Sequence, residues 1–372
     1  MIRRIAIEAT RMYAGRHVPS GQGRSPAVLV QSIGGLGNTL MATPLLRALR
    51  LTLPEARIDL ITSPGAAELL AGAQGVDRIV IDPLYTHGGL RLLRAYRRLL
   101  AEEGYDWCIH TLNAVIFKGI LGVAATRIPR RVGHAYSFSR WEDHTRLFTD
   151  VVPIDPSRHD VENNLQLLRP VLGSVPNSGA LELTLPEESF DEARTRLAER
   201  GWDPSRPTIG LSPGSSGWMS FKRWPEESYR ELARRLLGEG NEPNVMVLCG
   251  PDEADAAERW RESLGDRVIV VEGLPIRAFA ATLRCCDVVV CNDSLPVHLC
   301  AALGVPTVAL YGPTDPARTG PWRAPGVVVT PEGDWRPWFH LPNPPDPATQ
   351  PDYMARIGVD RVFRETTNML AG

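Results

Sequence analysis

The feature that most constrains this chain is a strand–turn–helix–strand run that begins at residue 288. Three consecutive valines form a short apolar strand, and the polar turn Asn292–Asp293–Ser294 ends it. An apolar helix follows as far as Gly304, where glycine favours a helix stop, and a second apolar strand comes directly after it. Apolar strands joined by a helix are typical of a parallel sheet that is covered on both faces. The run therefore predicts an α/β fold.

The turn inside this run has the geometry of an anion site. A helix that starts at the carboxyl end of a parallel strand points its free backbone N–H groups and its positive dipole end toward the loop. Asp293 is itself an anion, so it fits sugar hydroxyls beside a phosphate better than the phosphate. Asp293 and Ser294 are also common helix caps, and a purely structural cap stays open as the alternative.

The same alternation of strands and helices fills the rest of the chain twice. One series starts at the apolar run Ala27–Gln31 and the other at Pro207–Leu211, with Pro, Gly and Ser clusters around one charged helix at 173–206 between them. We predict an α/β protein with two Rossmann-like lobes whose parallel sheets face a central cleft. The predicted boundaries are a basic extension at 1–26, an N-terminal domain at 27–180, a C-terminal domain at 200–345, and a helix within 350–372 that packs back on the N-terminal domain.

The composition argues against several classes of protein. The chain of 372 residues carries a net charge of −2, which gives no reason to expect nucleic acid as a partner. Its histidines and cysteines do not fall at metal-ligand spacing, so no metal site is predicted. No apolar run approaches the roughly 18 residues of a transmembrane helix. The six cysteines contain no C-x-x-C pair and lie in apolar surroundings, which predicts buried thiols and a cytoplasmic protein.

Two basic segments bear on contact with a membrane. Residues 1–26 are basic but lack the apolar centre of a signal peptide, and a disordered tail is one interpretation of them. The stretch RLLRAYRR at 91–98 predicts an amphipathic helix whose basic face is either simply solvated or in contact with an anionic surface. We therefore expect at most peripheral contact with the inner face of the membrane.

Three loops of the second half predict a nucleoside-diphosphate site. Loops that follow parallel strands open on one edge of the sheet, so residues 212–223, 250–253 and 292–298 can meet there. The first loop offers the cations Lys222 and Arg223, the second offers carboxylates for ribose hydroxyls, and the third offers a helix N-terminus. The two cations alone would be interpreted as an ordinary solvated pair; the convergence of three loops favours a binding site.

These segments resemble glycosyltransferase family 9, the ADP-heptose:lipopolysaccharide heptosyltransferases and their relatives, from about residue 27 to residue 370. The matching pieces are VLVQSIGGLGNTLMATPLLRALR, HDVENNLQLL, IGLSPGSSGWMSFKRWP and NDSLPVHLCAALGVPTVALYGPTDPARTGPW, of which the last is the most specific. The resemblance implies a GT-B fold whose C-terminal lobe holds a nucleotide-sugar donor and whose N-terminal lobe holds the acceptor. It also implies an inverting, metal-independent transfer of a sugar to a saccharide or glycolipid hydroxyl, with no cofactor, most often of heptose from ADP-heptose.

The resemblance assigns candidate residues by motif. In the donor site, Lys222 and the backbone N–H groups of Ser294 and Leu295 would bind the diphosphate, and Asp293 would contact the donor sugar. A carboxylate at 252 or 253 would hold the ribose. The full set of donor-binding candidates is Ser215, Ser216, Lys222, Asp252, Glu253, Leu274, Asp293, Ser294, Leu295 and His298. His298 has an equal alternative as a structural histidine. The acceptor-binding candidates are Gly35, Gly37, Asn38 and His134, and the catalytic candidates are Asn38, His110 and Asp293.

Two positions depart from the family pattern. Asn38 stands where the family usually has an aspartate that serves as general base, and an amide cannot accept that proton. His110, His134 and Asp143 are candidate replacements, although each is also an ordinary core or loop residue. Leu295 stands where glycine is usual, and its side chain would narrow the donor pocket.

These departures leave three functions open. The first is transfer of heptose from ADP-heptose. The second is the same fold acting on another nucleotide sugar and a soluble or secondary-metabolite acceptor. The third is a non-catalytic nucleotide-sugar-binding protein. The acceptor loops carry no readable code, and the sequence predicts no oligomeric state.

Overall fold

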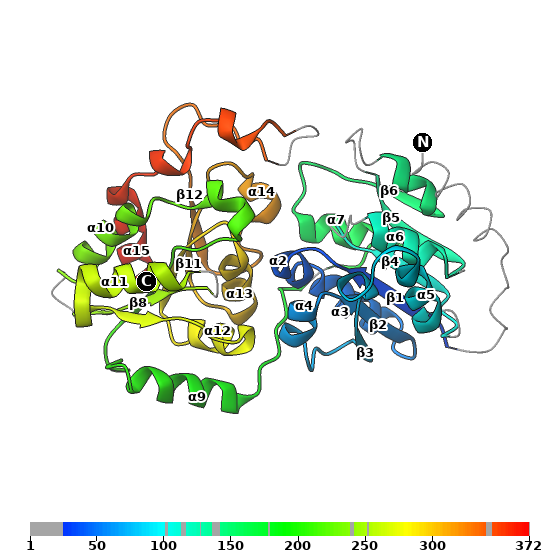
Figure 1. The fold of residues 1–372 in the computed structure, drawn as a ribbon, viewed down its shortest axis with the longest axis horizontal. Helices are drawn as coiled ribbons and strands as arrows, with labels where there is room; N and C mark the ends of the chain where they lie inside the picture. Colours follow the sequence, from blue (N-terminus) through cyan, green and yellow to red (C-terminus); the bar gives the residue numbers. More distant parts are fainter. Residues whose placement is uncertain are drawn as a thin grey trace. The chain divides into compact units, whose positions relative to one another are not determined.

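The computed structural model describes residues 25–100, 103–112, 117–126, 128–135, 142–177, 179–238, 242–250, 253–339 and 344–371, and only the backbone at 117, 142–144 and 254. The chain splits into unit 1, Met1–Thr184, and unit 2, Leu185–Gly372. Each unit contains one sheet with helices packed around it (Figure 1). Most of the predicted extension at 1–26 lies outside the described residues.

Unit 1 is built on a 6-stranded parallel sheet in the order β3-β2-β1-β4-β5-β6. Its strands are β1 (Ala27–Ser32), β2 (Arg57–Thr62), β3 (Arg78–Ile81), β4 (Trp107–His110), β5 (Arg130–Ala135) and β6 (Asp150–Pro153). Its helices are α2 (Leu36–Leu40), α3 (Thr43–Thr52), α4 (Pro64–Leu69), α5 (Gly89–Leu100), α6 (Phe117–Ala124), α7 (Asp160–Gln166) and α8 (Arg169–Leu172), with 3-10 turns η1 (Pro83–Tyr85) and η2 (Glu142–Leu147).

Unit 2 repeats the pattern with a 6-stranded parallel sheet in the order β12-β11-β10-β7-β8-β9. Its strands are β7 (Thr208–Ser212), β8 (Asn244–Leu248), β9 (Ile269–Val271), β10 (Val288–Asn292), β11 (Thr307–Leu310) and β12 (Gly326–Val329). Its helices are α9 (Glu187–Ala198), α10 (Glu226–Leu236), α11 (Ala254–Leu264), α12 (Ile276–Leu283), α13 (Leu295–Leu303), α14 (Pro316–Thr319) and α15 (Val359–Ala371), with 3-10 turns η3 (Gly217–Lys222), η4 (Gly265–Arg267), η5 (Pro347–Thr349) and η6 (Met354–Arg356).

The central strands explain the apolar runs of the sequence. All residues of β1, β7, β8 and β10 are buried, because helices cover both faces of a parallel sheet. Each unit has its own hydrophobic core: Leu29, Ile61 and Tyr96 belong to that of unit 1, and Trp224 and Trp260 to that of unit 2. The predicted α/β fold with two Rossmann-like parallel sheets is confirmed.

The strand order reverses once in each sheet, and this reversal defines a switch point. In unit 1 the chain winds from β1 toward β3 and then returns to continue through β4, so the order reverses between β1 and β4. In unit 2 the reversal falls between β7 and β10. Ligands of such sheets bind outside the carboxyl ends of the strands at this switch point. The glycine-rich turn after β1 and the turn at Asp293 after β10 both flank a switch point.

Three strands were not expected from the sequence. β5 and β6 occupy a region where apolar periodicity is weak, and β12 follows a Pro- and Gly-rich loop. β6 and β12 are edge strands. The residues of β6 alternate between half-buried and exposed, and only the last residue of β12 is buried. Edge strands need fewer apolar side chains, so their sequences carry a weaker signal.

The C-terminal helix departs from its predicted position. We expected it to pack back on the N-terminal domain, but α15 packs on α10 and on strands β10, β11 and β12 of unit 2. Val362 is completely buried there, with Phe363 and Leu370 packed against the same core. The apolar face of the helix therefore completes the core of its own unit. The charged helix α9 of the predicted link also packs within unit 2, against α12.

Candidate functional site

Asn292, the last residue of β10, ties together the loops at the switch point of unit 2. Its Nδ2 donates hydrogen bonds to the carbonyl oxygens of Pro213 (2.7 Å) and Gly214 (3.4 Å) in the loop after β7. Its Oδ1 accepts from the backbone N–H of Trp224 (3.0 Å) and from the hydroxyl of Tyr229 (3.2 Å). The side chain is fully buried, so these bonds fix the β7 loop in place against the end of β10.

Asp293, the residue after Asn292, forms a buried ion pair with Lys222. The Lys222 Nζ lies 2.7 Å from Oδ2 of Asp293, and only 9% and 6% of the two side chains is exposed. Burial of a charged pair costs desolvation energy that the attraction between the charges often fails to repay, so stability alone does not explain it. Burial and the negative charge of Asp293 raise the pKa of the Tyr311 hydroxyl, which therefore stays neutral beside the pair.

The first turn of α13 presents backbone N–H groups at the same edge. Ser294 is the N-cap residue, yet its side chain does not cap the helix and donates instead to the Gly214 carbonyl (3.4 Å). Pro296 has no N–H group. The hydrogen bonds of the described residues provide no acceptor for the N–H groups of Ser294 and Leu295. Simple helix capping is therefore not the role of Ser294, and this turn offers two donors to an anion.

Arg223 braces the loop after β7. Its Nε donates to the hydroxyl of Ser215 (3.2 Å) and its guanidinium donates to the Ser215 carbonyl (2.5 Å). The Glu253 carboxylate lies 3.9 Å from Arg223 and accepts the Gly250 N–H (2.8 Å). A Cβ at Gly214 would lie 2.3 Å from this carboxylate, so any larger residue there would displace the Glu253 side chain. Glu253 and Ser215 are thus engaged in holding the loop.

An aromatic wall completes the surroundings of the ion pair. The Lys222 Nζ lies 4.9 Å from the ring centre of Phe339, within the range of a cation–π contact. Phe221 packs 5.3 Å from both Trp338 and Phe339. The backbone N–H groups of Trp338 and Phe339 both donate to the Pro313 carbonyl (2.9 Å), which anchors this segment on the loop after β11.

The other predicted donor residues occupy varied environments. Ser216 is exposed at the tip of the β7 loop, and Leu274 is half-buried in the loop after β9. His298 is buried within α13, with 5% of its surface exposed. Asp252 lies outside the described residues. Their roles in donor binding stay predictions.

The glycine-rich turn of unit 1 forms the start of a short helix rather than an open loop. Gly35 is the N-cap of α2, and Gly37 and the half-buried Asn38 lie within it. The Tyr85 hydroxyl donates to the carbonyl of Ile33 (3.0 Å) and so ties η1 to this turn. Asn38 therefore lies at the carboxyl edge of the sheet, next to the switch point, as an acceptor-binding residue would.

Asn164 of α7 performs in unit 1 a task similar to that of Asn292. Its Oδ1 accepts the backbone N–H of Leu112 (2.7 Å) after β4, and its Nδ2 donates to the carbonyl of Met41 (3.4 Å) between α2 and α3. The side chain is 1% exposed. It joins the two loops that flank the β1–β4 switch point.

The histidines proposed as alternative bases are buried. His110 is 2% exposed, and its ring centre lies 5.0 Å from that of Phe148. His134 on β5 is 1% exposed, with Nδ1 lying 3.1 Å from the carbonyl of Val152 on β6. A general base must come within hydrogen-bonding reach of the acceptor hydroxyl, so either ring would first need to become accessible. The side chain of Asp143 lies outside the described residues.

A neutral hydrogen-bond network lies beneath the glycine-rich turn. The buried Asp82 carboxylate accepts hydrogen bonds from Gln31 Nε2 (2.7 Å), from the Tyr96 hydroxyl and from the Leu84 N–H (2.9 Å). Burial raises the pKa of Asp82, although these hydrogen bonds act in the opposite direction. Burial and the nearby Asp82 charge also raise the pKa of Tyr96. Gly122 is required here because a Cβ would lie 2.1 Å from the Tyr96 ring.

Sequence reasoning missed three contributors to the two sites. Asn292 and Asn164 position loops from the ends of elements, and Phe339 lies more than a hundred residues from Lys222 along the chain. A polar residue that ends a buried strand could have identified Asn292, because buried polar groups require hydrogen-bond partners. Asn164 and Phe339 have no local pattern, since their roles depend on tertiary contacts.

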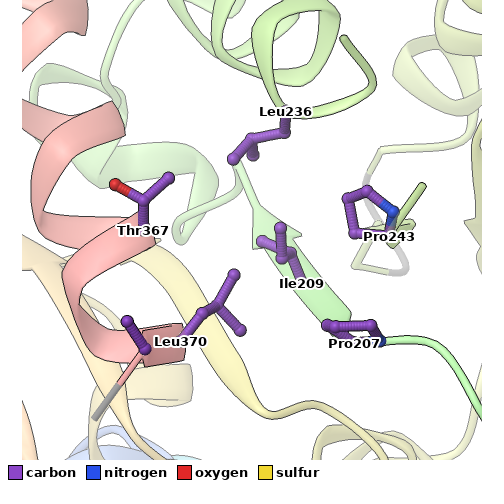
Figure 2. Close-up of a pocket in the computed structure, with 7 residues that line it drawn as sticks. Pro207, Ile209, Leu236, Pro243, Thr367 and Leu370 are labelled. Carbon is purple, nitrogen blue, oxygen red and sulfur yellow. The ribbon is translucent and has the colours of Figure 1, made fainter. Parts of the chain in front are cut away.

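The apolar groove drawn in Figure 2 lies elsewhere in unit 2. It is lined by Ile209, Leu236, Leu370 and Thr367, together with Pro207 and Pro243, which immediately precede β7 and β8. Its volume is about 170 Å³. The prolines mark the amino ends of the strands, whereas Asn292 and Asp293 mark the carboxyl ends. The groove is thus not part of the candidate site.

The chemistry of the two candidate sites differs. Unit 2 offers a cation, a carboxylate and free helix N–H groups, which together suit a phosphorylated sugar. Unit 1 offers amides at the equivalent edge, which suit neutral hydroxyls. Within the described ranges, no cluster of three or more His, Cys, Asp or Glu side chains is arranged to hold a metal ion. In the same ranges, none of the helices combines the length and apolarity that crossing a bilayer requires.

Two Rossmann-like parallel sheets in one chain are the architecture of the GT-B fold. The chain belongs to glycosyltransferase family 9 (heptosyltransferase), whose sequence model matches residues 93–341. It is therefore a glycosyltransferase.

Individual relatives agree with this assignment. The lipopolysaccharide heptosyltransferase 2 of Salmonella typhimurium is 27% identical over 309 residues, which cover 79% of this chain and 85% of that protein. The solved glycosyltransferase family 9 structure from Veillonella parvula superposes with a TM-score of 0.78 at 21% identity, covering 95% of this chain and 99% of that one. The ADP-heptose lipopolysaccharide heptosyltransferase II of E. coli gives a TM-score of 0.73 at 24% identity, covering 93% and 98%.

Proposed function

We propose that this enzyme transfers heptose from ADP-heptose to a hydroxyl of a saccharide or lipopolysaccharide-type acceptor. The buried pair Lys222–Asp293 at the carboxyl edge of unit 2 is the observation that carries the proposal. It lies beside the free N–H groups of α13, where a diphosphate and the sugar attached to it can be bound together. The relatives named above, which are lipopolysaccharide heptosyltransferases, support the choice of sugar and acceptor.

Each group of the donor site has a proposed role. Lys222 and the N–H groups of Ser294 and Leu295 bind the diphosphate, and Asp293 accepts hydrogen bonds from the heptose hydroxyls. Ser215 and Ser216 border the diphosphate, while Glu253 or Asp252 holds the ribose and Leu274 packs near the base. His298 supports the first turn of α13 from behind. Diphosphate binding would draw Lys222 partly away from Asp293 and free that carboxylate for the sugar.

The reaction forms one bond and breaks one. The acceptor oxygen bonds to the anomeric carbon while the bond from that carbon to the phosphate oxygen breaks, so the configuration inverts and ADP leaves with the electron pair. The ammonium of Lys222 and the α13 dipole offset the charge that develops on the leaving diphosphate, and we propose that no divalent ion is needed. The acceptor hydroxyl loses its proton to a general base.

Unit 1 is the proposed acceptor side. The amide of Asn38 can donate to or accept from a sugar hydroxyl, but it cannot take up the proton. Gly35 and Gly37 allow the acceptor to approach the turn closely. His110 and His134 are the remaining candidate bases, and either would act only after becoming accessible from its buried position.

Leu295 favours a second candidate, in which the same site uses a different nucleotide sugar. The side chain is half-buried at the first position of α13, next to Asp293, so it takes up space that glycine would leave free. A smaller sugar than heptose would fit more easily. Replacement by glycine, Leu295→Gly, should then increase the preference for heptose.

Thermal unfolding with a panel of nucleotides tests the donor assignment. At a hundred times its dissociation constant, a ligand adds about 2.7 kcal/mol to the stability of the folded state. We expect stabilisation by ADP and ADP-heptose but not by UDP, GDP, CDP or TDP, and transfer of heptose in the presence of EDTA. Stabilisation by another nucleotide would show that the donor carries that nucleotide instead of ADP. The absence of any response would overturn the proposed site.

We propose that the enzyme acts in the cytoplasm, where nucleotide sugars are available. Five of its six cysteines are buried, and burial raises the pKa of Cys249 and Cys300 to about 12, so these thiols stay protonated. Labelling of intact cells with a thiol reagent that does not cross membranes should leave the protein unmodified. Labelling that requires no lysis would contradict this location.

A further inference from the structure

Helix α5 of unit 1 has an outward face that differs from those of helices α10 and α11 in unit 2. Leu92, Tyr96 and Leu100 recur at helical spacing and are buried in the core of unit 1. The opposite face carries an exposed leucine and exposed arginines. We define the α5 basic face as Leu90, Arg91, Arg94 and Arg98.

The charges of this face have no ion-pair partner among the described residues. The segment from Pro83 to Ala101 contains no aspartate or glutamate. Among the described residues, no carboxylate forms an ion pair with Arg91, Arg94 or Arg98. Lys118, on the neighbouring helix α6, is exposed as well and adds to the positive potential.

Helices α10 and α11 of unit 2 provide the contrast. Arg230, Arg234 and Arg235 of α10 each lie within 4.0 Å of a glutamate on the same helix. Arg259 and Arg261 of α11 likewise pair with glutamates. Arginines on these two helices are thus paired with glutamates, whereas Arg91, Arg94 and Arg98 of α5 have no such partner among the described residues.

Apolar exposure is concentrated in the same segment. Of the six large apolar side chains that are most exposed in the described part of the chain, three are Ile81, Tyr85 and Leu90. Leu90 is 74% exposed, next to Arg91. A face that combines unpaired arginines with an exposed leucine is typical of a helix that lies on an anionic bilayer.

The position of α5 also fits a membrane-bound acceptor. The helix follows η1 at the carboxyl end of β3, and Tyr85 of η1 donates its hydroxyl to the Ile33 carbonyl in the glycine-rich turn. The start of the α5 basic face thus lies on the sheet edge that carries Asn38.

We propose that the α5 basic face docks unit 1 on a membrane surface rich in anionic lipid headgroups, with Leu90 inserted among them. The arginines bind the headgroup phosphates, and docking holds the glycine-rich turn close to lipid-linked acceptors. The acceptor part of this inference rests on the proposed function, whereas the docking itself does not.

Co-sedimentation of the full-length protein with vesicles tests the docking. We expect binding to phosphatidylcholine vesicles that contain phosphatidylglycerol, little binding to phosphatidylcholine alone, and weaker binding as salt increases. The triple variant R91Q/R94Q/R98Q should bind about 100-fold more weakly, since each basic residue near an anionic surface contributes about 1 kcal/mol. Leu90→Ser should weaken by about tenfold the binding that persists at high salt.

A matched variant and a ligand measurement control the experiment. R234Q/R259Q/R261Q removes the same charge from exposed, ion-paired positions of unit 2 and should bind vesicles as the parent does. ADP should stabilise both variants as it does the parent, which verifies folding. Vesicle binding that persists without any sugar transfer would refute the proposed function and keep the docking.

Three outcomes would overturn the proposal. The triple variant could bind vesicles as strongly as the parent, as it would if the basic N-terminal extension were responsible. The parent could bind phosphatidylcholine as well as anionic vesicles. It could also bind single-stranded DNA more tightly than vesicles, which would make nucleic acid the partner.

Discussion

The two units share one strand order and differ in the chemistry of their switch points. In unit 2 the edge between β7 and β10 holds a buried cation and carboxylate, Lys222 and Asp293. In unit 1 the corresponding edge between β1 and β4 holds amides, those of Asn38 and Asn164. Because the strand order is shared, the difference comes from the residues that follow the strands, which are charged in unit 2 and neutral in unit 1.

Buried carboxylates illustrate the difference. Asp293 faces the Lys222 ammonium, whereas Asp82 of unit 1 receives hydrogen bonds from neutral donors, among them Gln31 and Tyr96. A neutral environment leaves the cost of burying the charge largely uncompensated, and the pKa of Asp82 is accordingly raised. Unit 2 thus maintains a charged site, while unit 1 favours a neutral one.

Loss of the Lys222 cation, which distinguishes unit 2 from unit 1, should have the largest effect on activity and stability. Lys222→Met removes the charge proposed to bind the diphosphate and leaves the buried Asp293 carboxylate without its cation. We expect kcat/KM for sugar transfer to fall by roughly 10²–10³-fold. The free energy of unfolding should drop by about 3–5 kcal/mol, because one charge of the pair stays buried. Steady-state kinetics and urea denaturation measure the two effects.

A double variant separates binding from folding. In Lys222→Met/Asp293→Asn the uncompensated charge is gone, so most of the lost stability should return while activity stays low. Recovery of activity together with stability would mean that the pair is structural, and would contradict its role in donor binding.

The two asparagines sharpen the comparison, because each joins the loops of one switch point. Asn292→Ala leaves several buried hydrogen-bonding groups without their partner and should lower the free energy of unfolding by about 3 kcal/mol. Asn164→Ala should lower it by about 1–2 kcal/mol. Asn292→Ala should weaken ADP binding and leave the acceptor KM unchanged. Asn164→Ala should raise the acceptor KM and leave ADP binding unchanged. Calorimetry with ADP and kinetics at varied acceptor concentration provide the readouts.

The reciprocal design supplies the control for this pair. Asn292→Ala and Asn164→Ala serve as controls for each other, since both lose buried amide hydrogen bonds at the end of a sheet. If both variants weakened donor and acceptor binding to the same degree, the two switch points would not have separate ligands.

The different chemistry of the two switch points can be predicted from the sequence only in part. Apolar strands, helix stops and the turn at Asp293 were readable because burial and backbone conformation leave a local pattern. The sequence also predicted Lys222 and Asp293 for the same candidate site, and the structure brings the two side chains together. It could not reveal that they pair at 2.7 Å, because their separation of 71 residues is closed only by the parallel pairing of β7 with β10.

The failures share a physical cause. The placement of α15 on unit 2 depends on which apolar surface is left uncovered, and that is a property of the assembled sheet. Phe339 contacts Lys222 through a segment without regular secondary structure, so no periodicity marks it. The buried position of His110 likewise follows from packing against Phe148 and not from its place at a strand end.

A smaller effect should come from the aromatic wall of unit 2. Phe339→Leu removes the ring 4.9 Å from Lys222 Nζ, and a cation–π contact is worth about 0.5–2 kcal/mol. We expect ADP binding to weaken by about threefold to tenfold, with little change in unfolding. Phe339→Tyr retains the ring and should bind ADP as the parent does. Equal weakening in both variants would point to altered packing and not to the cation–π contact.

The smallest effect should appear in unit 1, as a dependence on pH. Because burial raises the pKa of Asp82 in the folded state, the native protein binds more protons than the unfolded chain between the unfolded pKa, about 3.9, and the folded one. The contribution of Asp82 to stability is therefore fully present below the unfolded pKa and is lost as pH rises through the folded pKa. Asp82→Asn keeps the shape but cannot ionise, so it should flatten this decline. Urea denaturation of both proteins across that pH range measures how the free energy of unfolding changes with pH. Equal slopes would show that folding does not raise the pKa of Asp82.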